Sequence, residues 1–254
     1  MSVRTETRGR VRVITIDRPE VRNAVDRATA AALLDACQRA DADPSVAVVV
    51  VTGAGGTFCA GADLHAVEDP QRRNRLERDV RGPMGPTRRT PTKPVIAAIE
   101  GHAVAGGLEL ALWCDLRVAA DDAVLGVFCR RWGVPLIDGG TVRLPRVVGL
   151  GRALDLVLTG RPVDAQEALA MGLVTALAPS GRALESAVDL GSRLAELPQR
   201  TLLADLAATR AAFDRPLPDA LLAEHDSGMA AIEAGGMADV ARFRAGGGRS
   251  GAPA

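Results

Sequence analysis

The hydrophobic and polar positions of this chain form short apolar runs that alternate with longer stretches of helical spacing. Strands are predicted at 11–17, 46–52 and 94–100, where β-branched residues dominate the runs. Between the first two runs, residues 26–40 repeat apolar positions with the period of a helix, and Asp26 is suited to cap its N-terminus. Short buried strands that alternate with helices favour an α/β fold.

The same pattern continues along the rest of the chain. Shorter strands are predicted at 115–119, 123–128 and 173–178, and helices at 108–113, 139–148, 152–158 and 164–171. From Arg182 onward the spacing is helical, with breaks at Pro198 and Pro216, and residues 246–254 are expected to be frayed.

Residues 71–89 have a different texture, with seven arginines, several prolines and glycines, and little apolar periodicity. Two interpretations stay open for this segment. It is a solvated loop, or it is a flap over a site that meets anionic ligand groups.

Composition and missing motifs exclude several classes of function. Basic and acidic residues balance at 31 each and aromatic residues make up 2%, which argues against a nucleic-acid-binding protein. The chain has no CxxC pair, P-loop, GxSxG elbow or HExxH motif, and Phe58 breaks a possible dinucleotide-binding pattern after Gly53. Because no signal-like segment or membrane span is visible either, we expect a soluble cytoplasmic protein without a metal site.

Two glycine-rich turns carry the candidate chemistry, at 57–64 and 100–110. Small residues let a ligand approach the backbone closely, and the first amides of a helix have no partner inside it. Two such amides that converge on one oxygen would form an oxyanion hole. Glu109 lies one helical turn after Gly106 in an apolar stretch, so it is either an active-site carboxylate or a solvent-facing group at a helix start.

With these motifs, the sequence resembles the crotonase family, also called the enoyl-CoA hydratase/isomerase superfamily. The matching segments are 22–24, 58–64, 94–115, 139–144 and 158–174. The resemblance implies an α/β spiral of strand–strand–helix repeats over residues 1–190, followed by a helical region at 191–254 of the same unit. In the family, such a C-terminal region assembles the chains as a homotrimer or as a dimer of trimers.

The resemblance also implies an acyl-CoA thioester as substrate and no separate cofactor, since CoA is part of the substrate. The amides of Ala62 and Gly106 match the family's oxyanion hole, and Glu109 matches the first of the two glutamates that family hydratases use. The residues expected to contact substrate are Arg22, Ala24, Ala60, Ala62, Asp63, Leu64, His65 and Gly106.

Two positions depart from the family pattern. Cys129 stands where hydratases carry their second glutamate, and packing beside Phe128 is its simpler interpretation. Asp138 lies beside the position where some relatives place a catalytic aspartate, and the alternative is that it caps the next helix.

The leading hypothesis is therefore an enoyl-CoA hydratase-like lyase with Glu109 as acid and base. An isomerase with a single carboxylate, and an acyl-CoA-binding protein with little turnover, stay open because the second glutamate is missing.

Overall fold

The computed structural model describes residues 2–78, 81–237, 240 and 244. The chain divides into two compact units, Met1–Leu194 and Ala195–Ala254, which are described separately below. The tail predicted to be frayed, 246–254, lies outside the described residues.

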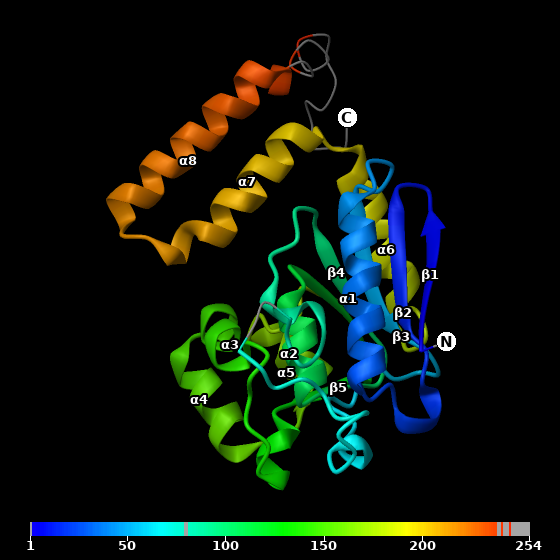
Figure 1. Ribbon diagram of the computed structural model, residues 1–254. Helices are drawn as coiled ribbons and strands as arrows, with labels where there is room; N and C mark the ends of the chain where they lie inside the picture. Colours follow the sequence, from blue (N-terminus) through cyan, green and yellow to red (C-terminus); the bar gives the residue numbers. More distant parts are fainter. Residues whose placement is uncertain (1, 79–80, 238–239, 241–243, 245–254) are drawn as a thin grey trace. The chain divides into compact units, whose positions relative to one another are not determined.

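A six-stranded sheet forms the centre of the first unit (Figure 1). β1 pairs antiparallel with β2, and every later neighbour in the order β1-β2-β3-β4-β6-β9 is parallel. The strands are β1 (Val3–Arg8), β2 (Val11–Ile16), β3 (Val48–Gly53), β4 (Val95–Ile99), β6 (Leu116–Ala120) and β9 (Ala176–Ala178). β4 is buried along its whole length, as expected for a parallel strand covered on both faces.

A second sheet has three short strands, and its first strand lies within the second glycine-rich turn. β5 (His102–Val104) pairs parallel with β7 (Val124–Gly126), which pairs antiparallel with β8 (Val163–Asp164). β5 leads directly into α2, so this small sheet fixes where that helix begins.

Helices cover both faces of the main sheet in the first unit (Figure 1). The Asp26 side chain caps α1 by accepting a 2.9 Å hydrogen bond from the Thr29 amide, which confirms the predicted cap. On the other face, a Cβ on Gly191 of α6 would lie 3.2 Å from Val11 of β2, so that helix packs closely on the sheet. The α-helices are α1 (Arg27–Ala42), α2 (Gly106–Trp113), α3 (Gly140–Val148), α4 (Leu150–Thr159), α5 (Ala165–Ala170) and α6 (Ala183–Glu196), and the 3-10 helices are η1 (Pro19–Val21), η2 (Leu64–Ala66), η3 (Pro86–Arg88) and η4 (Phe128–Trp132).

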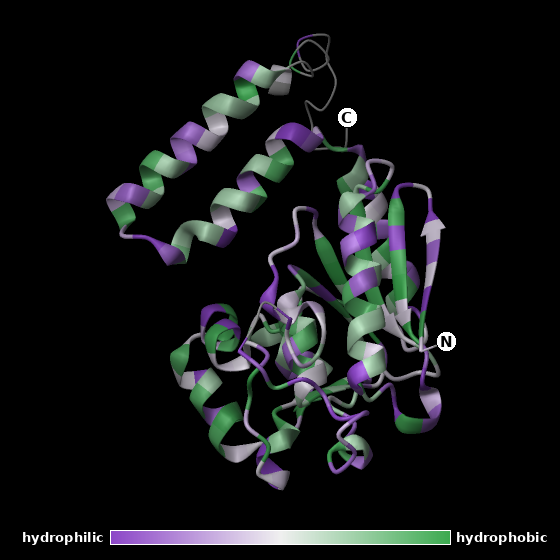
Figure 2. Cartoon of the chain, in the orientation of Figure 1, coloured by the Kyte–Doolittle hydropathy of each residue, from purple (hydrophilic) through white to green (hydrophobic). Residues whose placement is uncertain are grey.

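The second unit contains α7 (Gln199–Ala211), η5 (Ala212–Asp214), α8 (Leu217–Ala231) and the π-helical turn η6 (Ile232–Gly236). α7 and α8 lie side by side as a hairpin, and prolines precede both helices, as the sequence predicts. Neither helix has a buried residue, although apolar residues are frequent along both (Figure 2). The large apolar side chains left exposed here include Phe213, Leu217, Leu221, Leu222, Met229 and Ile232.

The sequence misses three strands, β1, β5 and β8. β1 is an edge strand with a single buried residue, so it lacks an apolar run. β5 and β8 are shorter than the window over which alternation can be recognised. Segment 71–89 is loop and turn with the 3-10 helix η3 near its end, as far as it is described. Among the described residues, no helix is both long and apolar enough to cross a bilayer.

Candidate active site

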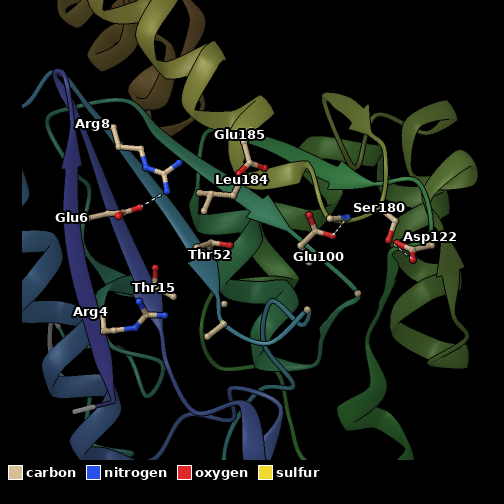
Figure 3. Close-up of a pocket in the computed structure, with 15 residues that line it drawn as sticks. Arg4, Glu6, Arg8, Thr15, Thr52, Glu100, Asp122, Ser180, Leu184 and Glu185 are labelled. Atoms are coloured by element: carbon tan, nitrogen blue, oxygen red, sulfur yellow. Dashed lines mark hydrogen bonds and ion pairs between the residues drawn. The ribbon is translucent and has the colours of Figure 1, made fainter.

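Two large cavities open in the first unit, and they differ in character. The first, of about 520 Å³, lies where β1, β3 and the start of α6 meet (Figure 3). Several of its charged groups are engaged within the protein: Arg8 pairs with Glu6 at 2.6 Å, and Glu100 accepts hydrogen bonds from the amides of Gly181 and Ala183. These contacts hold the β1 edge and the start of α6, and none of the sequence-predicted site residues lies there.

The second cavity, of about 470 Å³, brings together segments that are distant in the sequence. Both glycine-rich turns, helix α2, the 3-10 helix η4 and the loop before α3 contribute to its wall. The sequence-predicted residues that line it are Ala60, Ala62, Leu64, Gly106, Glu109 and Asp138, together with Cys129. This cavity is therefore the candidate active site.

The two glycine-rich turns touch each other at this cavity. A Cβ added to Gly61 would lie 2.9 Å from the amide nitrogen of Gly106, so the first turn passes directly over the start of α2. Gly106 is the first residue of that helix, and its amide has no acceptor within the helix. Among the described residues, no acceptor is found for the amide of Ala62 or of Gly106. Both donors are thus available to a ligand.

Glu109 lies on α2, one turn after the Gly106 amide, with 3% of its surface exposed. Its Oε1 accepts hydrogen bonds from the amides of Asp138 (2.9 Å) and Gly140 (2.8 Å). Its Oε2 has no partner, and no side-chain oxygen in the described residues is both buried and unpartnered, so Oε2 faces the cavity. A Cβ on Gly140 would approach Oε1 to 3.0 Å, which explains the need for glycine there.

The environment of Glu109 favours its neutral form. Burial is the largest cause that raises the pKa of the carboxyl group, and the negative charge of Asp138 also raises it, while the two amide hydrogen bonds and the charge of Arg143 lower it. The net result is a pKa of about 7. A carboxyl group with a pKa near neutrality can both accept and return a proton at physiological pH.

Asp138 does not cap the next helix, so that interpretation is wrong. Gly139 is the N-cap of α3 and has no side chain to serve as a cap. The buried Asp138 Oδ1 instead accepts hydrogen bonds from the Met84 amide at 3.0 Å and from the Thr87 hydroxyl. Burial raises the pKa of Asp138, and its unpartnered Oδ2 faces the cavity by the same reasoning as Oε2 of Glu109.

Cys129 belongs to η4 and forms part of the cavity wall, 5% exposed. Burial and the nearby charge of Glu109 raise the pKa of its thiol, so the group stays protonated and neutral. The cavity wall therefore carries a neutral thiol in addition to the carboxyl group of Glu109.

Four of the predicted substrate-contacting residues lie outside the cavity lining: Arg22, Ala24, Asp63 and His65. Asp63 is buried, pairs with Arg18 at 3.0 Å and caps η2 by accepting from the His65 amide. The Ala24 carbonyl accepts a 2.6 Å hydrogen bond from Arg18. Asp63 and Ala24 therefore stabilise the first glycine-rich turn without lining the cavity. Arg22 and His65 are exposed at the surface.

Sequence reasoning missed the residues that fix the outer wall of the cavity. Arg143 donates to the backbone oxygens of Asp138 (2.9 Å) and Thr87 (2.6 Å), and Asn74 and Met84 line the cavity. Asn74 and Met84 lie in segment 71–89, which gives no periodic signal that would single them out. Within the described residues, no group of three or more His, Cys, Asp or Glu side chains is placed to hold a metal ion.

The fold and this cavity define an α/β protein with a backbone-amide pair and a buried carboxyl group at one site. A family model described as enoyl-CoA hydratase/isomerase matches residues 6–234. The chain is 38% identical over 196 residues to enoyl-CoA hydratase EchA19 of Mycobacterium tuberculosis, covering 74% of this chain and 73% of the relative. It is 38% identical over 186 residues to 2,3-dehydroadipyl-CoA hydratase of Escherichia coli, covering 73% and 72%.

Solved structures agree with these relatives. The structure of enoyl-CoA hydratase EchA1 from Mycobacterium marinum matches with a TM-score of 0.87 and 38% identity, covering 91% of this chain and 90% of that one. The chain therefore belongs to the enoyl-CoA hydratase/isomerase, or crotonase, family of enzymes, and its α/β fold with C-terminal helices is the crotonase fold.

Proposed function

We propose that this enzyme adds water across the double bond of a 2-enoyl-CoA thioester, with Glu109 as the acid–base group. One observation carries the proposal: the Glu109 carboxyl, with a pKa of about 7, opens into the same cavity as the unpartnered amides of Ala62 and Gly106. The hydratase names of the relatives support the same reaction.

In the proposed reaction, the thioester oxygen accepts hydrogen bonds from the amides of Ala62 and Gly106. Glu109 takes a proton from water as the water oxygen forms its bond to C3, and the electron pair of the double bond moves toward the thioester oxygen. Each of the two amides should stabilise the resulting enolate by about 3 kcal/mol. Glu109 then returns the proton to C2, so the sum is the addition of one water molecule.

Asp138 is the second carboxylate that we assign to the site. Its Oδ2 faces the cavity, and its charge raises the pKa of Glu109. Two carboxyl groups coupled in this way titrate as a pair. Asp138 therefore makes the ionised Glu109 carboxylate a stronger base, and it can accept a hydrogen bond from the attacking water.

The assay follows the loss of conjugated-enone absorbance when crotonyl-CoA is hydrated. We expect Glu109→Gln to abolish turnover, because an amide cannot accept the proton from water. Glu20→Gln, an exposed glutamate on η1, is the matched control and keeps full activity. Wild-type rates in the Glu109 variant would remove this residue from the mechanism.

A second candidate is an isomerase that moves the double bond of a 3-enoyl-CoA into conjugation. The observation that favours it is Cys129, which offers no second carboxylate beside Glu109. Glu109 alone would then carry the proton from C2 to C4. A 3-enoyl-CoA that gains enone absorbance, together with inert crotonyl-CoA, identifies the isomerase. Acyl-CoA binding without either change identifies a binding protein.

We further propose that the chain assembles as a homotrimer or a dimer of trimers. The hairpin of α7 and α8 has no buried residue of its own, and Leu150, Leu154 and Leu158 form an exposed apolar stripe on α4. Light scattering after gel filtration is expected to give three or six times the 26.4 kDa chain mass. A mass of one chain contradicts the assembly.

A further inference from the structure

One polar group in the active-site cavity has no part in the proposed acid–base chemistry: the side-chain amide of Asn74. Asn74 lies in the loop after the first glycine-rich turn and is 8% exposed. Its Nδ2 donates to the backbone oxygens of Val25 at 3.0 Å and Pro83 at 2.7 Å. Both hydrogens of the amide nitrogen are therefore used by the protein.

The amide oxygen of Asn74 is in the opposite situation. Oδ1 accepts no hydrogen bond from any described residue, and no oxygen of a described side chain is both buried and unpartnered. Oδ1 therefore keeps some exposed surface, and Asn74 is a residue of the cavity wall. The amide cannot be turned around, because its oxygen would then meet two carbonyl oxygens.

A single peptide group, between Pro83 and Met84, separates the side chain of Asn74 from that of Asp138. Asn74 binds the carbonyl of Pro83, while Asp138 binds the N–H of Met84, and these belong to the same peptide bond. Carbonyl and N–H point in opposite directions in a trans peptide. Asn74 and Asp138 therefore grip this peptide from two sides, and Asn74 meets a different part of a bound substrate from Asp138.

The wall around Asn74 is largely apolar, so the amide oxygen should distinguish between ligand groups that donate a hydrogen bond and groups that do not. Neighbouring lining residues include Leu76, Pro83 and Met84. An alkyl group placed against Oδ1 leaves a buried acceptor without a partner, which costs free energy. An ionised carboxylate has no hydrogen to donate to the amide oxygen, so it cannot satisfy Oδ1, although Arg73 lines the same cavity. A hydroxyl group donates a hydrogen bond and is neutral.

We propose that Asn74 determines acyl specificity by accepting a hydrogen bond from a hydroxyl group on the acyl chain of the CoA thioester. This inference rests on the proposed acyl-CoA site. It names hydroxylated acyl-CoA thioesters as the preferred substrate class and assigns Asn74 no role in proton transfer.

Calorimetric binding tests the proposal without turnover. Saturated acyl-CoA thioesters of increasing length are compared with their ω-hydroxy counterparts, since saturated chains cannot be hydrated. At the length where the hydroxyl reaches Oδ1, we expect binding about fivefold tighter than for the plain chain, which corresponds to one neutral hydrogen bond. Asn74→Leu keeps the size and removes the acceptor together with the two donors that bind Val25 and Pro83, and in this variant the two chains should bind equally.

Thr87→Val is the matched control, because it loosens the same wall without touching Asn74. The Thr87 hydroxyl holds Asp138, which in turn holds Met84. This variant should weaken both ligands together and keep the fivefold ratio. The proposal is overturned if no length shows a hydroxyl preference, if the preference survives in Asn74→Leu, or if neither ligand binds. A hydroxyl preference combined with inert crotonyl-CoA overturns only the hydratase function.

Discussion

Replacing Glu109 by glutamine should make the enzyme inactive and, above neutral pH, more stable. The pKa of this carboxyl is raised from 4.5 to about 7 in the folded protein, mainly by burial. Below pH 4.5 the group is protonated in the folded and the unfolded chain, so it affects stability little. Above about pH 7 it is ionised in both states, and the folded protein alone bears the cost of a buried charge.

The size of this cost follows from the shift in pKa. A shift from 4.5 to about 7 corresponds to roughly 3 kcal/mol, at about 1.4 kcal/mol for each pKa unit. Glutamine removes the titration, and its Oε1 can still accept from the amides of Asp138 and Gly140 that hold the carboxylate. The free energy of unfolding of Glu109→Gln should therefore exceed that of the wild type by up to about 3 kcal/mol at pH 8.

Urea unfolding at pH 5 and pH 8 measures this difference, with Glu20→Gln as the control for an exposed glutamate. The gap between Glu109→Gln and the wild type should be small at pH 5, grow between pH 4.5 and about 7, and stay constant above about pH 7. A gap that is the same at both pH values, or a wild type that is the more stable protein at pH 8, would refute the reasoning. Such a result would mean that the site compensates the buried charge.

The other predictions concern the surroundings of Glu109. Asp138→Asn should lower the pKa of Glu109, because it removes a neighbouring negative charge. The acid limb of the pH–rate profile for crotonyl-CoA should then move to lower pH. An unmoved limb would mean that the two carboxyl groups are not coupled. Gly140→Ala should reduce kcat by about 100-fold, since its Cβ would push against the carboxyl group, whereas Gly151→Ala meets nothing within 4 Å and should leave kcat unchanged. Cys129→Glu should raise the hydration rate if a second carboxylate is what the wall lacks, and an unchanged or lower rate counts against that idea.

The parts of the fold that the sequence predicts are those where local pattern and tertiary structure agree. β3 and β4 are buried on both faces, so each is a continuous apolar run that can be recognised without knowledge of its partners. β1 forms because β2 offers a free edge, and its exposed residues follow no apolar pattern. Asp26 caps α1 as its position suggests, because its contact is with a residue three positions away.

In the candidate active site too, the sequence predicts residues of local motifs and misses the roles of residues that are fixed by long-range contacts. Ala62, Gly106 and Glu109 belong to two compact motifs, so the resemblance to the family was enough to single them out. Asp138 bonds to Thr87 across 51 positions, and this long-range contact overrides the local preference of an aspartate to cap the helix that follows. Asn74 bonds to Val25 across 49 positions, from a loop without periodicity, and only the folded chain brings the two together.

Helix α2 holds the two principal groups of the proposed reaction at a fixed separation. The donor amide of Gly106 and the carboxyl of Glu109 lie on the same helix, three residues apart, so the rise of about 1.5 Å per residue fixes their separation along the axis. The other groups, Cys129, Asp138 and Asn74, come from separate segments of the wall. In the proposed reaction, a substitution at one of these can change which proton moves, or which acyl chain fits, while the separation of the Gly106 amide and the Glu109 carboxyl along the helix is kept. The thiol of Cys129 therefore belongs to the variable wall of this site, and it leaves the arrangement of Gly106 and Glu109 on α2 in place.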